Sequence, residues 1–282
     1  MLRDITIGQF YPGDSLIHRF DPRVKILGAL VYLISLFLFR NLVGYLVVVA
    51  FLGAVIFLSR VPLTYAMKGL QSIVALLLFT TIFHFFFTKG NVLLAAGPVQ
   101  ISEEGVKKGV FLGLRLLLLV IGSSYLTYTT TAKRLTDGLE NLMSPLKKIR
   151  VPVHDIATMM ALTLRFIPVL LEETNRLIKA QQARGADLNE GTLWQKAKIM
   201  TSMVVPLLVS ATGRSFELAV AMESRCYQGD RGRTQMKPLR YQTQDRIGLV
   251  VIAFYVILVW LAGRIPAGEG GGILALLFSP CI

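Results

Sequence analysis

The sequence predicts an all-α integral membrane protein with about five transmembrane helices and a cytoplasmic domain of crossing amphipathic helices inserted before the last span. Hydrophobic residues make up 54% of the 282 residues, and the mean hydropathy is +0.59, values typical of a polytopic membrane protein. Apolar segments recur along the chain at lengths close to those that a bilayer needs. The block that precedes the last of them, above all residues 165–229, carries recurring charges and is expected to be too charged for lipid.

Five apolar segments are predicted to cross the membrane. Residues 24–39 and 42–58 count as two spans, because one helix through both would far exceed the about 20 residues that a bilayer needs. The other three spans are residues 70–87, 109–129 and 247–261. Between the third and fourth spans, two short apolar runs beside Gly and Pro residues predict a small β-hairpin outside the bilayer, made of residues 92–94 and 99–101.

Three regions follow from this pattern. Residues 1–131 hold an N-terminal arm and four transmembrane helices, residues 132–246 form a cytoplasmic domain of amphipathic helices, and residues 247–282 hold the last transmembrane helix and a C-terminal tail. Residues 1–25 are polar and have no apolar core, so we expect no cleaved leader.

The cytoplasmic domain is predicted to contain three helices. The first is short and amphipathic, with Leu135 and Leu139 on one face, and it ends at Ser144-Pro145. The second runs from Pro152 through a kink at Pro168 to Arg184, with Gly185 as a left-handed cap. The third begins near Thr192, bends near Pro206 and ends at Arg225.

The positive charge is concentrated in the loops and in the cytoplasmic domain. The formal net charge is +13, which in a soluble domain would suggest nucleic acid, but cationic cytoplasmic loops explain it in a membrane protein, so no nucleic-acid partner is expected. The distribution of Lys and Arg places the N-terminus and residues 132–246 in the cytoplasm and the C-terminus outside.

No enzyme motif accompanies these helices. The sequence lacks a glycine-rich phosphate loop, and its three histidines have no metal-ligand spacing, so we expect no catalytic residue, no metal site and no cofactor in this chain. For the isolated polar residues the ordinary explanation is favoured: packing for His84 rather than a proton relay, and snorkelling for Arg115 rather than gating. Glu172 and Glu173 fit a solvated face, or the N-terminal end of a helix after Pro168, better than acid–base chemistry.

Two tripeptides close the two long helices: Ala183-Arg184-Gly185 and Ser224-Arg225-Cys226. A cation near a helix C-terminus offsets the macrodipole, which is the ordinary explanation of both arginines. The layout favours a second role, since Pro168 precedes Arg176 by the same interval as Pro206 precedes Arg214. Two similar basic helix ends suit docking into two similar clefts, where a guanidinium can pair bidentately with a carboxylate.

Several phrases resemble one family closely. They are residues 15–25 with the core Asp-Pro-Arg-Val-Lys at 21–25, Arg-Phe-Ile-Pro at 165–168, residues 180–185 and residues 221–227. On these phrases the whole chain resembles the transmembrane T component of energy-coupling factor transporters, the family that includes the cobalt-transport permease CbiQ. Ala183-Arg184-Gly185 has the usual form of the family, whereas the residues that flank Arg225 depart from it.

The resemblance implies an energy-coupling subunit of an importer for vitamins or transition-metal ions in the bacterial plasma membrane. Two ABC ATPases would bind ATP and Mg, and a separate membrane S component would bind substrate. The different residues around the two arginines favour two ATPases that are not identical. The arginines of the two tripeptides would pair with acidic residues of the ATPases. Neighbouring apolar residues would contact the grooves and the S component: Leu177, Ile178, Leu218 and Val220.

Two other classes of protein stay open at this point. A membrane enzyme with an active site at the bilayer surface would need converging His, Asp or Glu residues, and His154 and Asp155 are the only neighbours of that kind. A stand-alone transporter would show inverted repeats or broken helices around polar groups, and the apolar spans show no convincing repeat. Nothing in the sequence indicates the substrate.

Overall fold

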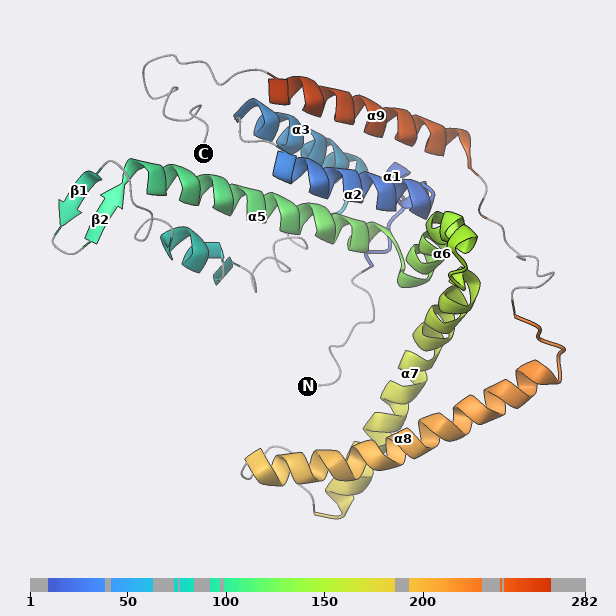
Figure 1. Cartoon of the computed structure of the whole chain (residues 1–282). Coiled ribbons are helices and arrows are strands. Elements are labelled where there is room, and N and C mark those ends of the chain that lie inside the picture. Colours follow the sequence, from blue (N-terminus) through green and yellow to red (C-terminus); the bar gives the residue numbers. More distant parts are fainter. Residues whose placement is uncertain are drawn as a thin grey trace. The chain divides into compact units, whose positions relative to one another are not determined.

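A computed structural model describes residues 10–38, 42–62, 74–75, 77–83, 92–96, 99–185, 193–229, 239 and 241–264. Within this part the chain is almost entirely helical (Figure 1), which confirms the predicted all-α membrane fold. The exception is the predicted hairpin, in which β1 (Val92–Ala96) pairs antiparallel with β2 (Val99–Ser102) and Ala96 lies opposite Val99.

The contacts divide the described residues into two compact units. Residues 10–138 and 239–264 form the first, called the bundle unit here, and residues 139–229 form the second, called the crossed-helix unit. The boundaries predicted at residues 132 and 246 follow the change from apolar to charged sequence, whereas the two units follow contacts between residues. The predicted division into regions therefore stays a prediction.

The helices of the bundle unit begin with the short α1 and include three long apolar helices and α9, which follows the crossed-helix unit in the chain. Their bounds are α1 (Leu16–Arg19), α2 (Pro22–Leu38), α3 (Leu42–Ser59), α5 (Glu103–Thr129) and α9 (Thr243–Arg264). The segment predicted as the third span, 70–87, is described only at residues 74–75 and 77–83, which are helical. His84 lies outside the described residues.

Tyrosines hold the core of the bundle unit together. The Tyr32 hydroxyl of α2 donates to the carbonyl of Leu118 in α5 at 2.9 Å, and the hydroxyls of Ser35 and Tyr255 lie 2.6 Å apart, joining α2 to α9. The Phe51 ring of α3 stacks on Tyr255, with centroids 4.2 Å apart. Because these polar groups are paired, they can be buried in an apolar surrounding without the penalty of an unmade hydrogen bond.

Gly122 allows α2 and α5 to approach closely. A Cβ atom at this position would overlap the Tyr32 ring, so any larger residue would displace the ring from its bond to Leu118. Small residues commonly permit such close helix contacts in membrane proteins.

The crossed-helix unit contains the end of α6 (Ala132–Met143), a 3₁₀ turn (Ser144–Ile149), α7 (Val153–Ala183) and α8 (Leu193–Glu223). These bounds agree with the predicted helices to within a few residues, and both long helices continue through Pro168 and Pro206. In α7 only Val153 and Ala157 are buried, and the described side chains of α8 are exposed or half-buried. Most side chains of the two helices are therefore not buried within this unit.

Length and composition identify four membrane-spanning candidates among the described helices. Two lie in the bundle unit, Gly109–Thr129 and Thr243–Arg264, and two are Val153–Ala183 and Ala197–Glu223 of the crossed-helix unit. The expectation that residues 165–229 are too charged for lipid therefore does not hold along their whole length. The reason is an uneven charge distribution, because residues 199–213 carry no charge while charged residues recur through 172–184 and 214–225.

Candidate functional site

The first helix end is built around Arg184. This residue is the C-cap of α7, and its backbone N–H bonds back to the Gln181 carbonyl at 3.0 Å. Gly185 follows with φ of +86°, and its N–H donates to the Gln182 carbonyl at 3.0 Å. The predicted left-handed glycine cap is confirmed. Glycine adopts this backbone conformation without the steric penalty of a Cβ atom.

The second helix end repeats this geometry around Arg225. The Cys226 N–H donates to the Glu223 carbonyl at 2.9 Å, and the Tyr227 N–H donates to the Met222 carbonyl at 3.1 Å. This pair of bonds is a Schellman cap, in which the residue after the cap takes a left-handed conformation. Here that residue is Cys226, with φ of +57°.

The two tripeptides are therefore equivalent in backbone structure. Each arginine sits at the C-cap, and the residue after it has positive φ, glycine in one helix and cysteine in the other. The different residues around Arg225 change the chemistry of the cap and leave its form intact. Both arginine side chains are exposed, and within the described part of the chain neither makes a hydrogen bond or an ion pair.

A polar contact fixes the point where α7 and α8 cross (Figure 1). The Glu173 carboxylate accepts a hydrogen bond from the Ser210 hydroxyl at 2.5 Å and pairs with the Arg214 guanidinium at 2.9 Å. From the sequence alone Glu173 is expected on a solvated face or at the start of a post-proline helix, and Arg214 is only a spacing marker, so this contact is not predicted. The only hint of this contact in the sequence is that one helix carries an acidic residue and the other a basic residue. Each helix has several charged residues, so the sequence does not show which two would pair.

The predicted contact residues lie between this crossing and the helix ends. Val220 is 65% exposed, whereas Leu177, Ile178 and Leu218 are half-buried. A group of apolar side chains earlier in α8, for which the sequence predicts no role, is more than half exposed: Met200, Val204, Val205, Leu208 and Val209.

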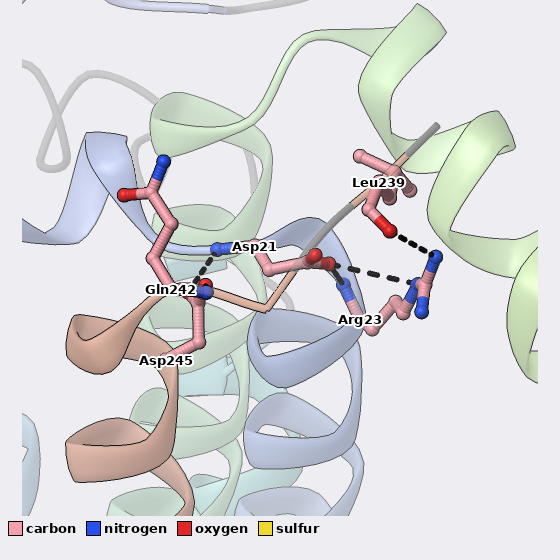
Figure 2. Close-up of polar contacts among 5 residues, drawn as sticks. All are labelled: Asp21, Arg23, Leu239, Gln242 and Asp245. Atoms are coloured by element: carbon pink, nitrogen blue, oxygen red, sulfur yellow. Dashed lines mark hydrogen bonds and ion pairs between the residues drawn. The ribbon is translucent and has the colours of Figure 1, made fainter. Parts of the chain in front are cut away.

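Asp21 and Arg23 of the motif at residues 21–25 bind the start of α9 and the residues just before it, a set of contacts called the clamp here (Figure 2). The Asp245 carboxylate accepts the Asp21 N–H at 2.7 Å with one oxygen and the Gln242 N–H at 2.7 Å with the other. The Arg23 guanidinium donates to the Leu239 carbonyl at 3.3 Å and lies over the Tyr241 ring. The N-terminal arm therefore holds the segment by which the chain returns from the crossed-helix unit.

The same arm also holds the segment that leads into the crossed-helix unit. The Lys25 ammonium donates to the carbonyls of Thr129, at the end of α5, and of His18. Arg134 of α6 donates to that His18 carbonyl at 3.5 Å, and the Tyr11 N–H donates to the Tyr128 carbonyl at 3.0 Å. The sequence does not predict these contacts of the arm, because the partners in α5 and α6 lie more than a hundred residues away.

The remaining polar candidates serve packing. His154 lies 2.9 Å from the Glu140 carboxylate and joins α6 to α7, and among the described residues no group of three metal-ligating side chains converges on it or elsewhere. Arg115 lies well inside α5 and donates to the Tyr45 hydroxyl of α3 at 3.1 Å. Snorkelling alone therefore does not describe Arg115, because a neighbouring helix supplies a partner for the guanidinium.

Comparisons with known proteins agree with this architecture. The CbiQ family, described as cobalt transport protein, matches residues 13–236. Three relatives bear the name energy-coupling factor transporter transmembrane protein EcfT. The protein from Ruminiclostridium cellulolyticum is 46% identical over 89% of this chain and 95% of its own length. That from Clostridium kluyveri is 45% identical over 95% and 100%, and that from Bacillus subtilis is 41% identical over 90% and 97%.

The match includes α7 and α8 with both arginine caps, as well as the N-terminal arm from residue 13 onward. The chain is a multi-pass membrane protein, and it belongs to the CbiQ family and, within it, to the transmembrane proteins of energy-coupling factor transporters.

Proposed function

We propose that this chain couples ATP hydrolysis to substrate import by passing the motion of two ABC ATPases to a separate substrate-binding S component. The observation that carries the proposal is the pair of equivalent helix ends. Arg184 and Arg225 occupy the same cap position, both are exposed, and the rest of the described chain gives neither a partner. An exposed guanidinium at a rigid helix end is well suited to bidentate pairing with a carboxylate of a partner.

The contact between Glu173 and Arg214 lets the two ends act together. It joins α7 to α8 through a charge-assisted bond, so a displacement of one helix is passed to the other near their crossing. In this proposal Ala183, Gly185, Ser224 and Cys226 shape the caps that present the two arginines to the ATPases.

The lengthwise separation of charge supports a second contact. The charged segments 172–184 and 214–225, at the ends of α7 and α8, lie in the cytoplasm against the ATPases, while the apolar turns before them face the membrane surface and the S component. Exposed apolar side chains at 200–209 supply this second contact, with Val220, Leu218, Leu177 and Ile178 nearer the ATPases. Large exposed apolar patches are typical of surfaces that another protein or a membrane covers.

The N-terminus and the helix ends are placed on the cytoplasmic side of a bacterial plasma membrane, following the excess of Lys and Arg there. ATP and Mg bind to the ATPases, and this chain contributes no catalytic group. The substrate is a vitamin or a transition-metal ion: the resemblance to energy-coupling factor transporters implies this class, and the cobalt transport description of the family supports its metal part alone.

Copurification and charge reversal test this proposal. The full chain, isolated from membranes, is expected to bring two ATPases and a small membrane protein with it. Arg184→Glu and Arg225→Glu are expected to leave membrane insertion intact and to abolish uptake in vesicles of the assembled complex. Lys133→Glu and Lys148→Glu are matched controls, since both lysines are exposed and lie outside α7 and α8, away from the proposed contacts. Normal uptake by the double arginine variant would exclude the role assigned to these residues.

A further inference from the structure

An apolar cavity of about 380 Å³ lies within the bundle unit. Residues of α1, α2, α3, α5 and α9 line it, and almost all of them are hydrophobic. The cavity is partly open rather than sealed, and small residues such as Gly28, Ala29 and Ala54 leave the space. An opening of this composition between membrane helices is filled more favourably by hydrocarbon than by water.

Polar groups occur at only a few places on the cavity wall. Lys25 lines it, and two of the three N–H groups of its ammonium are used by the carbonyls of His18 and Thr129. Tyr125 also lines it and is 2% exposed, yet within the described chain its hydroxyl has no hydrogen-bond partner. A buried hydroxyl without a partner loses the free energy of a hydrogen bond, which an acceptor on a bound molecule would restore.

A second hollow adjoins the cavity through two shared residues. Leu16 and Leu58 line both, and the second hollow also contains the exposed arginines Arg19 and Arg60 together with Asp14. Its charge is therefore one positive unit in excess. Within the described chain neither guanidinium makes a hydrogen bond or an ion pair. Arg60 also has φ of +54°, an unusual conformation for a residue with a Cβ atom.

We infer that the two hollows bind one anionic glycerophospholipid. Its phosphate lies between Arg19 and Arg60, and one acyl chain passes Leu16 and Leu58 into the cavity. An ester carbonyl of the lipid accepts from Lys25 or Tyr125. The charge and the continuous apolar lining together favour this occupant over a zwitterionic lipid, since a basic rim beside a hydrophobic slot matches an anionic headgroup with its chain. This inference does not depend on the coupling function proposed above.

The inference extends the role of the N-terminal arm. The lipid would contact α1 and the Lys25 side chain, the same residue that holds the end of α5, so an anionic lipid would stabilise the arm in its clamped position. Ligands that bind only the folded arrangement stabilise it by mass action.

Photo-crosslinking tests the site. The full chain is reconstituted into vesicles that contain a trace of phosphatidylglycerol or phosphatidylcholine, each with the same diazirine-bearing acyl chain, and the labelled peptides are mapped by mass spectrometry. Phosphatidylglycerol is expected to label peptides that contain Ala29, Tyr125 and Gly248, about tenfold more than phosphatidylcholine does, as two basic contacts predict.

Three variants sharpen the test. Arg19→Gln with Arg60→Asn, where Asn tolerates the left-handed backbone, is expected to remove the preference for phosphatidylglycerol. Ala29→Phe is expected to fill the cavity and to abolish labelling of its walls. Arg264→Gln is the matched control, because Arg264 lies at the opposite end of α9 from the cavity residues Gln244 and Gly248. Equal labelling by both lipids, labelling unchanged by the double arginine variant, or a cavity filled by a partner chain in the assembled transporter would each overturn the inference.

Discussion

The Asp245 carboxylate accepts the Asp21 backbone N–H at 2.7 Å across 224 residues of sequence. One residue stands at the start of α2 and the other in the first turn of α9, so the bond joins two parts of the bundle unit that the inserted residues 139–238 separate in sequence. Both residues are buried, and a carboxylate that accepts two backbone N–H groups is a strong acceptor.

Loss of this carboxylate is expected to weaken the clamp. Asp245→Ala leaves the buried N–H of Asp21 and the partly buried N–H of Gln242 without an acceptor, and the loss at the buried group alone costs about 1–3 kcal/mol. We expect a lower midpoint of thermal unfolding for the purified chain in detergent. Gln244→Ala, one residue away and without a described role in the clamp, is the control. An unchanged midpoint for Asp245→Ala would show that the clamp adds no stability.

The two caps predict opposite effects of glycine substitutions. Gly185→Ala places a Cβ atom at φ of +86° and is expected to destabilise the end of α7 by about 1 kcal/mol. Cys226→Gly relieves the same strain in α8 and is expected to stabilise that end by about 1 kcal/mol. Hydrogen exchange of residues 180–185 and 222–227 measures both effects.

Gly213 is the matched control for these substitutions. It lies inside α8 without positive φ, and a Cβ atom there would meet nothing within 4 Å. Gly213→Ala is therefore expected to stabilise the helix by about 0.5–1 kcal/mol. Stabilisation by Gly185→Ala as well would mean that the first cap is not left-handed.

The contact between Glu173 and Arg214 predicts a charge-swap rescue. Glu173→Arg and Arg214→Glu each place like charges at the crossing of α7 and α8, so each is expected to impair uptake by the assembled transporter. The double substitution restores opposite charges and is expected to recover part of the uptake. Failure of the double variant, with normal assembly, would argue that the geometry at Ser210 matters more than the charge pair.

The N-terminal arm is expected to loosen in acid. Burial lowers the pKa of the His18 imidazole below its ordinary value of 6.5, and the nearby Lys25 cation lowers it further, against the opposing effect of Asp14 and the Tyr11 carbonyl. The folded arm therefore favours neutral His18. Its contribution to stability is fully present above pH 6.5 and is lost as the pH falls towards the lower folded pKa.

Limited proteolysis of the arm between pH 7.5 and 5 measures this effect. Because Nε2 of His18 donates to the Tyr11 carbonyl, His18→Gln can keep a donor while removing the titration. Cleavage of the wild-type arm is expected to rise below pH 6.5, and cleavage of the variant is expected to change little. Parallel pH profiles for both proteins would assign the effect to another group.

Much of this protein can be predicted from its sequence because a bilayer imposes strong local rules. Apolar length predicts the spans at 109–129 and 247–261, turn residues predict the hairpin, and Gly185 predicts a left-handed cap. These features depend on neighbouring residues alone, and the phrases around Arg184 and Arg225 are specific enough to identify the family.

The tertiary structure decided what lies far apart in the chain. Glu173 pairs with Arg214, and Asp21 bonds to Asp245. Neither pair follows from local sequence, because a hydrogen bond specifies only that a donor needs an acceptor and leaves open which one. Packing of α2 against α5 and α9, and of α7 against α8, makes that choice by bringing particular groups within bonding distance.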